Sequence, residues 1–157
     1  MAQTEKDWYY EVVGDWGRLP DFIDYFSMKA EETRIELSMK GRIEEHSKKL
    51  PTITEQCFTR LQIINAVLRV FEIELDKIRS VHYKTFLEHY QRTLTSRDIE
   101  KYIDGEENVI STSLLINEIG LLRNVYVSLT KGLEIKGFQI NSVVKLRAAG
   151  LEDASLE

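Results

Sequence analysis

The chain has 157 residues, 30% of them charged, with a net charge of −5 and a single cysteine. This composition is typical of a globular protein, and one cysteine excludes an internal disulfide framework or a cysteine-based metal site. No apolar run approaches the ~20 residues that cross a bilayer, and the polar, acidic start does not resemble a signal peptide. We therefore expect no membrane contact and a reducing, cytoplasmic location.

Residues 1–50 are expected to form an N-terminal segment with two parts. Trp8 and Trp16 fall in residues 1–19, which are interpreted as an arm that docks aromatic side chains. Pro20 is a favourable first-turn residue and predicts the start of a helix, which should end at Leu50, before Pro51. Its expected apolar stripe is thin, so we expect a partly exposed helix; the stripe comprises Met28, Ile35, Met39, Ile43 and Leu50.

A heptad repeat predicts one long helix over about residues 52–91. No proline or glycine occurs between Thr52 and Gly105. Starting at Cys57, apolar residues alternate at spacings of four and three, which is the period of a helix that packs on other helices. This seam comprises Leu61, Ile64, Leu68, Phe71, Leu75 and Ile78.

Two further helices are predicted downstream. A short one spans residues 97–103 after Thr95, and a long one spans about residues 106–136, where Gly137 is a suitable C-terminal stop. The long helix continues the heptad period through Leu115, Ile119, Leu122 and Leu129. A final short helix is expected from Asn141 to Ala149, followed by an acidic tail.

The predicted fold is all-α, with two long antiparallel helices (about 52–91 and 106–136), an N-terminal helix and short C-terminal helices. The expected organisation is an N-terminal segment (1–50), a helical-hairpin core (51–150) and the tail (151–157). Helix faces that remain uncovered within one chain should drive a cyclic homo-oligomer.

No pattern predicts catalysis, a metal site or a cofactor. The chain lacks a phosphate-binding loop, a nucleophile elbow and a cysteine–histidine constellation. His82 and His89 are seven residues apart, whereas a metal pair on a helix is usually three or four apart, so they are interpreted as a polar layer. We expect a protein that is not an enzyme.

Basic residues interleaved with aromatic ones provide a candidate nucleic-acid site. Cations that bind phosphates beside rings that stack on bases suit single-stranded nucleic acid. The cations are Lys77, Arg79, Lys84, Arg92, Arg97 and Lys101, and the rings are those of Tyr83, Phe86, Tyr90 and Tyr102. The alternative interpretation is a solvated helix face with core aromatics. A second basic group could serve DNA or compensate a helix dipole; it comprises Lys131, Lys136, Lys145 and Arg147.

From Lys49 to about residue 150 the sequence resembles a known family. The matching segments are KTFLEHY, DIEKYIDGEENVI, the helix LLINEIGLLRNVYVSLTKGLEI and KGFQINSVVKLRAAG. They resemble UvsY, the recombination mediator of large tailed phages. Residues 1–48 have no counterpart in this resemblance.

The resemblance implies a helical ring in the host cytoplasm that binds single-stranded DNA. Such a protein loads a RecA-like recombinase against the competing single-strand-binding protein, so the implied partner is a phage recombinase. Lys84 falls on a family position associated with DNA binding, whereas the neighbouring basic position of the family is Phe86 here.

Two other functions fit the same helix pattern. A phage small terminase subunit is also a helical ring with a long hairpin, and it would bind viral DNA and a packaging motor protein. A purely structural helical adaptor would bind no nucleic acid. Preference for single strands over duplex DNA would separate the mediator from the terminase subunit.

Overall fold

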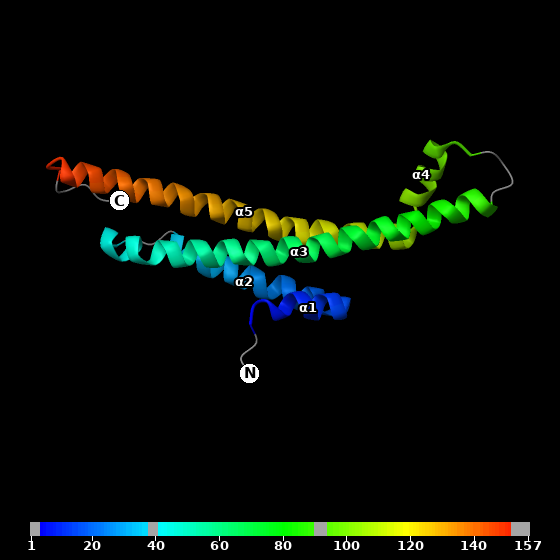
Figure 1. Ribbon diagram of the computed structural model, residues 1–157, viewed down its shortest axis with the longest axis horizontal. Coiled ribbons are helices and arrows are strands. Elements are labelled where there is room, and N and C mark those ends of the chain that lie inside the picture. The colour runs from blue at the N-terminus through cyan, green and yellow to red at the C-terminus, as the bar shows by residue number, and fades with distance from the viewer. Residues whose placement is uncertain (1–3, 38–40, 90–93, 152–157) are drawn as a thin grey trace.

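The computed structural model describes residues 4–37, 41–89 and 94–151 as an elongated bundle of helices (Figure 1). No strand occurs in these residues, which confirms the all-α prediction, and none of their helices is both long and apolar enough to cross a membrane. The elements are α1 (Asp7–Gly14), the 3-10 helix η1 (Trp16–Arg18), α2 (Leu19–Leu37), α3 (Ile43–His89), α4 (Ser96–Asp104) and α5 (Glu107–Ala148).

Helices α3 and α5 lie side by side along the length of the molecule (Figure 1). Positions that rise along α3 meet positions that fall along α5. The Cys57 thiol lies 3.6 Å from the Thr130 hydroxyl, and Arg123 Nε donates to Asn65 Oδ1 at 2.9 Å. The two helices therefore run in opposite directions.

The heptad seams of α3 and α5 lie inside this helix pair. Six seam residues are buried in one apolar core, with Leu68 and Leu115 packed against them; the six are Leu61, Ile64, Phe71, Ile119, Leu122 and Leu129. Leu75 and Ile78 pack in a second, smaller cluster with Ile99, Ile103 and Val109. Because the chain's own helices cover the seams, any assembly must use other surfaces.

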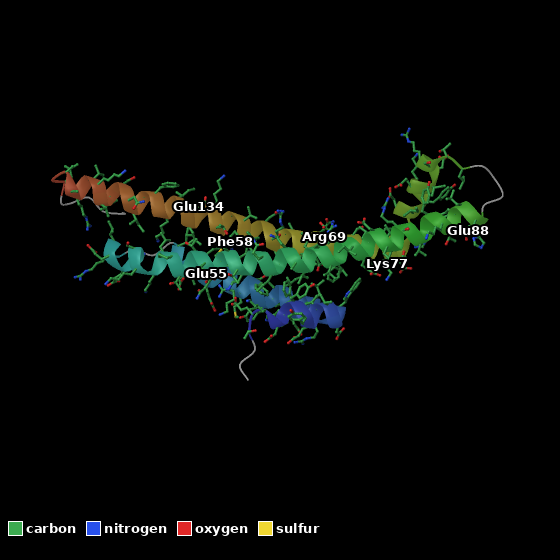
Figure 2. All side chains as sticks on the ribbon, in the orientation of Figure 1. Glu55, Phe58, Arg69, Lys77, Glu88 and Glu134 are labelled. Atoms are coloured by element: carbon green, nitrogen blue, oxygen red, sulfur yellow. The ribbon has the colours of Figure 1, made fainter. Side chains whose placement is uncertain are left out.

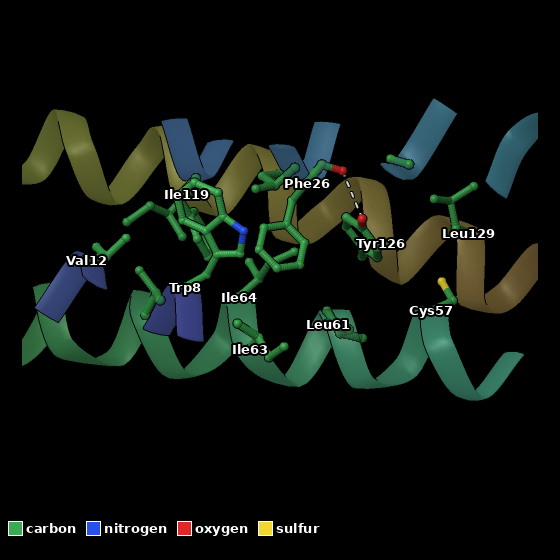
Figure 3. Packing of buried hydrophobic residues seen from close by; sticks show 14 of the residues in the cluster. Trp8, Val12, Phe26, Cys57, Leu61, Ile63, Ile64, Ile119, Tyr126 and Leu129 are labelled. Carbon is green, nitrogen blue, oxygen red and sulfur yellow. Dashed lines mark hydrogen bonds between the residues drawn. The ribbon is translucent and has the colours of Figure 1, made fainter. Parts of the chain in front are cut away.

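Helices α1 and α2 contribute buried side chains to the main core, beside those of α3 and α5 (Figure 3). Trp8 of α1 and Phe26 of α2 are buried there, and the Tyr126 hydroxyl of α5 donates to the Phe26 carbonyl at 2.8 Å. Burial raises the pKa of that hydroxyl. The predicted stripe of α2 is wrong, because Met28 and Ile35 are 51% and 68% exposed. The buried face is instead Leu19, Phe22, Phe26, Ala30 and Thr33.

The predicted boundary at Pro51 is also wrong. Helix α2 ends at Leu37, and α3 begins at Ile43 and continues through Pro51. An interior proline removes one helical hydrogen bond. Packing offsets this loss, because Ile43 is buried against α5. Met39 lies outside the described residues.

Helix α5 does not stop at Gly137, as the sequence predicted, but continues to Ala148, so the separate helix from Asn141 does not exist. A glycine inside a helix costs about 1 kcal/mol relative to alanine. Burial of Ile140 and Val143 against Ile43 offsets that cost. Helix α3 therefore begins before its predicted start and α5 ends after its predicted end, because the added residues of the two helices pack against each other. Most of the acidic tail (152–157) lies outside the described residues.

Candidate nucleic-acid interface

The candidate basic residues lie at the end of the molecule where α3, α4 and the start of α5 meet (Figure 1). The short helix α4 is close to its predicted span, and a capping box fixes its start: Thr95 accepts from the Asp98 amide, and the Asp98 carboxylate accepts from the Thr95 amide. Ile99 and Ile103 anchor α4 in the smaller apolar cluster. This end therefore has a defined local structure.

The side chain of Arg79 links α3 to α4. Its guanidinium donates to Asp104 Oδ1 and to Glu100 Oε2, each at 2.7 Å. The hydrogen bond to Asp104 is the largest of several contacts that raise the Arg79 pKa. With a carboxylate bound to each of its two terminal nitrogens, Arg79 is positioned to hold two helices together rather than to contact a phosphate.

Lys77 is more available than Arg79. Its ammonium lies 3.4 Å from Glu74 Oε2, one turn earlier, and its side chain is 71% exposed. An exposed pair of this kind is worth about 0–1 kcal/mol and is screened by salt, so it leaves Lys77 accessible to an anion.

Lys84, Arg97 and Lys101 are exposed, and none of them makes an ion pair with another described residue. Arg97 and Lys101 are four residues apart and share one face of α4. Lys101 contributes, after hydrogen bonds from Thr95, to the lowered pKa of Asp98. These three cations, with Lys77, are the part of the predicted set that the structure leaves accessible. Arg92 lies outside the described residues.

The aromatic residues of the predicted site mainly pack against the protein. The rings of Phe86 and Tyr102 stack at a centroid distance of 5.7 Å with an interplanar angle of 28°. Tyr83 and Phe86 also pack on the smaller apolar cluster, while Tyr102 remains 48% exposed. The stack joins α3 to α4; Lys84 lies two residues before Phe86 on α3, and Lys101 directly precedes Tyr102 on α4. Tyr90 lies outside the described residues.

In the second basic group, two residues have partners within the protein and two are exposed. Lys136 is buried, and its ammonium donates to the carbonyl oxygens of Leu37 at 2.6 Å and Glu36 at 3.4 Å. It therefore caps the C-terminus of α2, a role that the sequence did not predict, and burial lowers its pKa. Arg147 pairs with Glu44 at 3.4 Å. The remaining members, Lys131 and Lys145, are exposed.

The three histidines have different surroundings. His82 Nε2 lies 2.9 Å from Asn108 Oδ1, which connects α3 to α5. His89 is exposed, with Nδ1 3.1 Å from the Thr85 carbonyl oxygen. His46 is buried, and its pKa is lowered first by burial and then by Lys136. No group of three metal-binding side chains occurs in the part of the chain that the structure describes.

Acidic side chains accompany the cations at this end. Glu88 is exposed near the end of α3 (Figure 2), Glu106 is the N-cap residue of α5, and Glu107 is the first residue of that helix. Over residues 51–150 the chain carries 13 Lys or Arg and 12 Asp or Glu. One copy therefore presents a local cluster of cations rather than an extended positive field.

Comparisons with known proteins identified no relative: no family description, characterised protein or solved structure matched the chain.

Proposed function

We propose that the protein is a single-stranded-DNA-binding accessory protein that loads a RecA-like recombinase, and that its DNA contacts are made by the α3–α4 end. The observation that supports this best is that Lys84 on α3 and Arg97 and Lys101 on α4 are exposed, on two helices that Arg79 holds together. Lys84 is also the position that the resemblance to UvsY associates with DNA.

The charge balance explains why an assembly would matter for this function. A single copy offers few accessible cations, and each phosphate contact adds only a modest free energy in salt. Several copies that share one strand would multiply these contacts, since linked sites bind with a raised effective concentration. We therefore propose a homo-oligomer as the DNA-binding form.

A charge-matched pair of variants tests the site. Lys84→Ala with Arg97→Ala removes two cations at the α3–α4 end, and Lys48→Ala with Lys49→Ala removes two exposed cations at the other end of α3. Binding of a fluorescent single-stranded oligonucleotide is measured by anisotropy over a range of salt concentrations. The first variant should bind more weakly, with a salt slope reduced by about 1.4, and the second should bind like the wild-type protein.

The same assay separates the alternative functions. Equal loss of binding in both variants would remove the α3–α4 end as the site. Preference for duplex DNA would favour the small terminase subunit and its packaging motor partner. Absence of binding at low salt would favour a structural helical adaptor.

A further inference from the structure

The acidic side chains of α4 all have partners within the protein. Glu100 and Asp104 accept hydrogen bonds from Arg79 of α3, each at 2.7 Å. Asp98 belongs to the capping box at the start of α4, and its Oδ2 also accepts from the Thr95 hydroxyl at 2.6 Å. Neighbouring donors therefore engage the three carboxylates that α4 carries.

The cations of α4 are placed differently from its acids. Arg97 and Lys101 are both exposed, and residues four apart lie on the same face of a helix. Neither cation makes an ion pair with another described residue, whereas the ion pairs of α4 in these residues join its acids to Arg79. A phosphate can therefore bind Arg97 and Lys101 without displacing a carboxylate from either of them.

An aromatic ring follows these cations on α4. Tyr102 comes directly after Lys101 and is 48% exposed. Its ring stacks on that of Phe86 of α3, with a centroid distance of 5.7 Å and an interplanar angle of 28°. Phe86 in turn packs on the apolar cluster that contains Ile99 and Ile103. The stack thus restricts the orientation of the Tyr102 ring, and a side chain that is already ordered loses less conformational entropy when it binds a ligand.

We propose that Tyr102 stacks on a nucleobase of the bound strand, beside a phosphate held by Lys101 and Arg97. The inference rests on the proposed function and adds to it the residue that distinguishes single strands from duplex DNA. Consecutive side chains of a helix point about 100° apart, so the phosphate and the base of one nucleotide contact adjacent sides of α4. The bases of a single strand can stack on a protein ring, whereas removing a base from the stack of a duplex costs free energy.

A base-free strand tests the proposal, because it keeps the phosphates and lacks the bases. Fluorescence anisotropy measures binding to oligothymidylate and to an abasic strand of the same length. The wild-type protein should prefer oligothymidylate by about 5- to 150-fold, the contribution of one stacked base. Tyr102→Leu keeps an apolar side chain beside Phe86 but lacks the ring, so it should lose most of this preference. Its affinity for the abasic strand and its salt slope should equal those of the wild-type protein.

Two further variants separate stacking from a structural effect. Tyr102→Phe keeps the ring and should keep the preference for bases. Tyr10→Leu is the matched control, since Tyr10 is 72% exposed on α1, which does not contact α4, and it should bind both strands like the wild-type protein.

Three results would overturn the stacking role while the proposed function stands. They are equal wild-type affinity for the two strands, an undiminished preference in Tyr102→Leu, and a loss of affinity in Tyr102→Leu that is the same for both strands. Absence of wild-type binding to either strand at low salt would refute the proposed function itself and this inference with it.

Discussion

Replacing Phe26 with alanine should destabilise the whole protein, although Phe26 lies in the N-terminal segment. Its side chain is fully buried, with its ring centroid 4.7 Å from that of Phe22 and 6.3 Å from that of Tyr126. Removal of a buried phenylalanine side chain costs about 3–5 kcal/mol. Met28→Ala, two residues away on the exposed face of α2, should change the free energy of unfolding by less than about 0.5 kcal/mol.

Urea denaturation with two probes measures this effect. At a slope of about 2 kcal/mol per molar urea, Phe26→Ala should lower the midpoint by about 2 M. Trp8 and Trp16 report on the N-terminal segment, because their rings lie 5.4 Å from Tyr25 and 4.5 Å from Phe71, while circular dichroism reports on all helices. Both signals should shift together. A midpoint unchanged by Phe26→Ala, or a tryptophan transition that separates from the helical one, would refute the packing of α2 into the core.

Three further predictions concern single side chains. Arg79→Met should speed amide hydrogen exchange in α4 by an amount equivalent to about 1 kcal/mol, whereas Lys77→Met should not; equal protection in both would contradict the linking role of Arg79. The pKa of His46 is lowered from its ordinary 6.5, so the unfolded chain binds more protons and stability should fall as the pH drops below about 6.5. His46→Gln should flatten this acid dependence of the melting temperature, and an unchanged profile would assign it to other groups. Leu68→Asp in the seam should unfold the protein or sharply lower its melting temperature, and a variant with wild-type melting would show that the seam is not packed.

The heptad period predicted which residues of α3 and α5 are buried, because a repeat of alternating four and three is set by the geometry of helix packing itself. Helix ends were harder to predict. Pro51 and Gly137 are local stop signals, and both were overridden by contacts between residues more than ninety positions apart, such as Ile43 with Ile140. Local sequence carries no information about such contacts.

The candidate site was predictable as a list of cations but not as a surface. Sequence alone does not show which cations have partners within the protein. In the structure, Arg79 pairs with two carboxylates, and Lys136 is buried with its ammonium bound to the end of α2. The spacing of Glu100 and Asp104, one turn apart on α4, is a signal that could have identified a partner for Arg79. The apolar groove that Phe58 and Gly137 line lies between α3 and α5, which are neighbours in space but far apart in sequence, so no local sequence pattern predicts it.

The most direct test of the account is light scattering after gel filtration, with and without a fluorescent single-stranded oligonucleotide. We predict one discrete oligomer that carries the oligonucleotide at low salt and releases it at high salt. A monomer, or an oligomer from which the oligonucleotide separates even at low salt, would contradict the account.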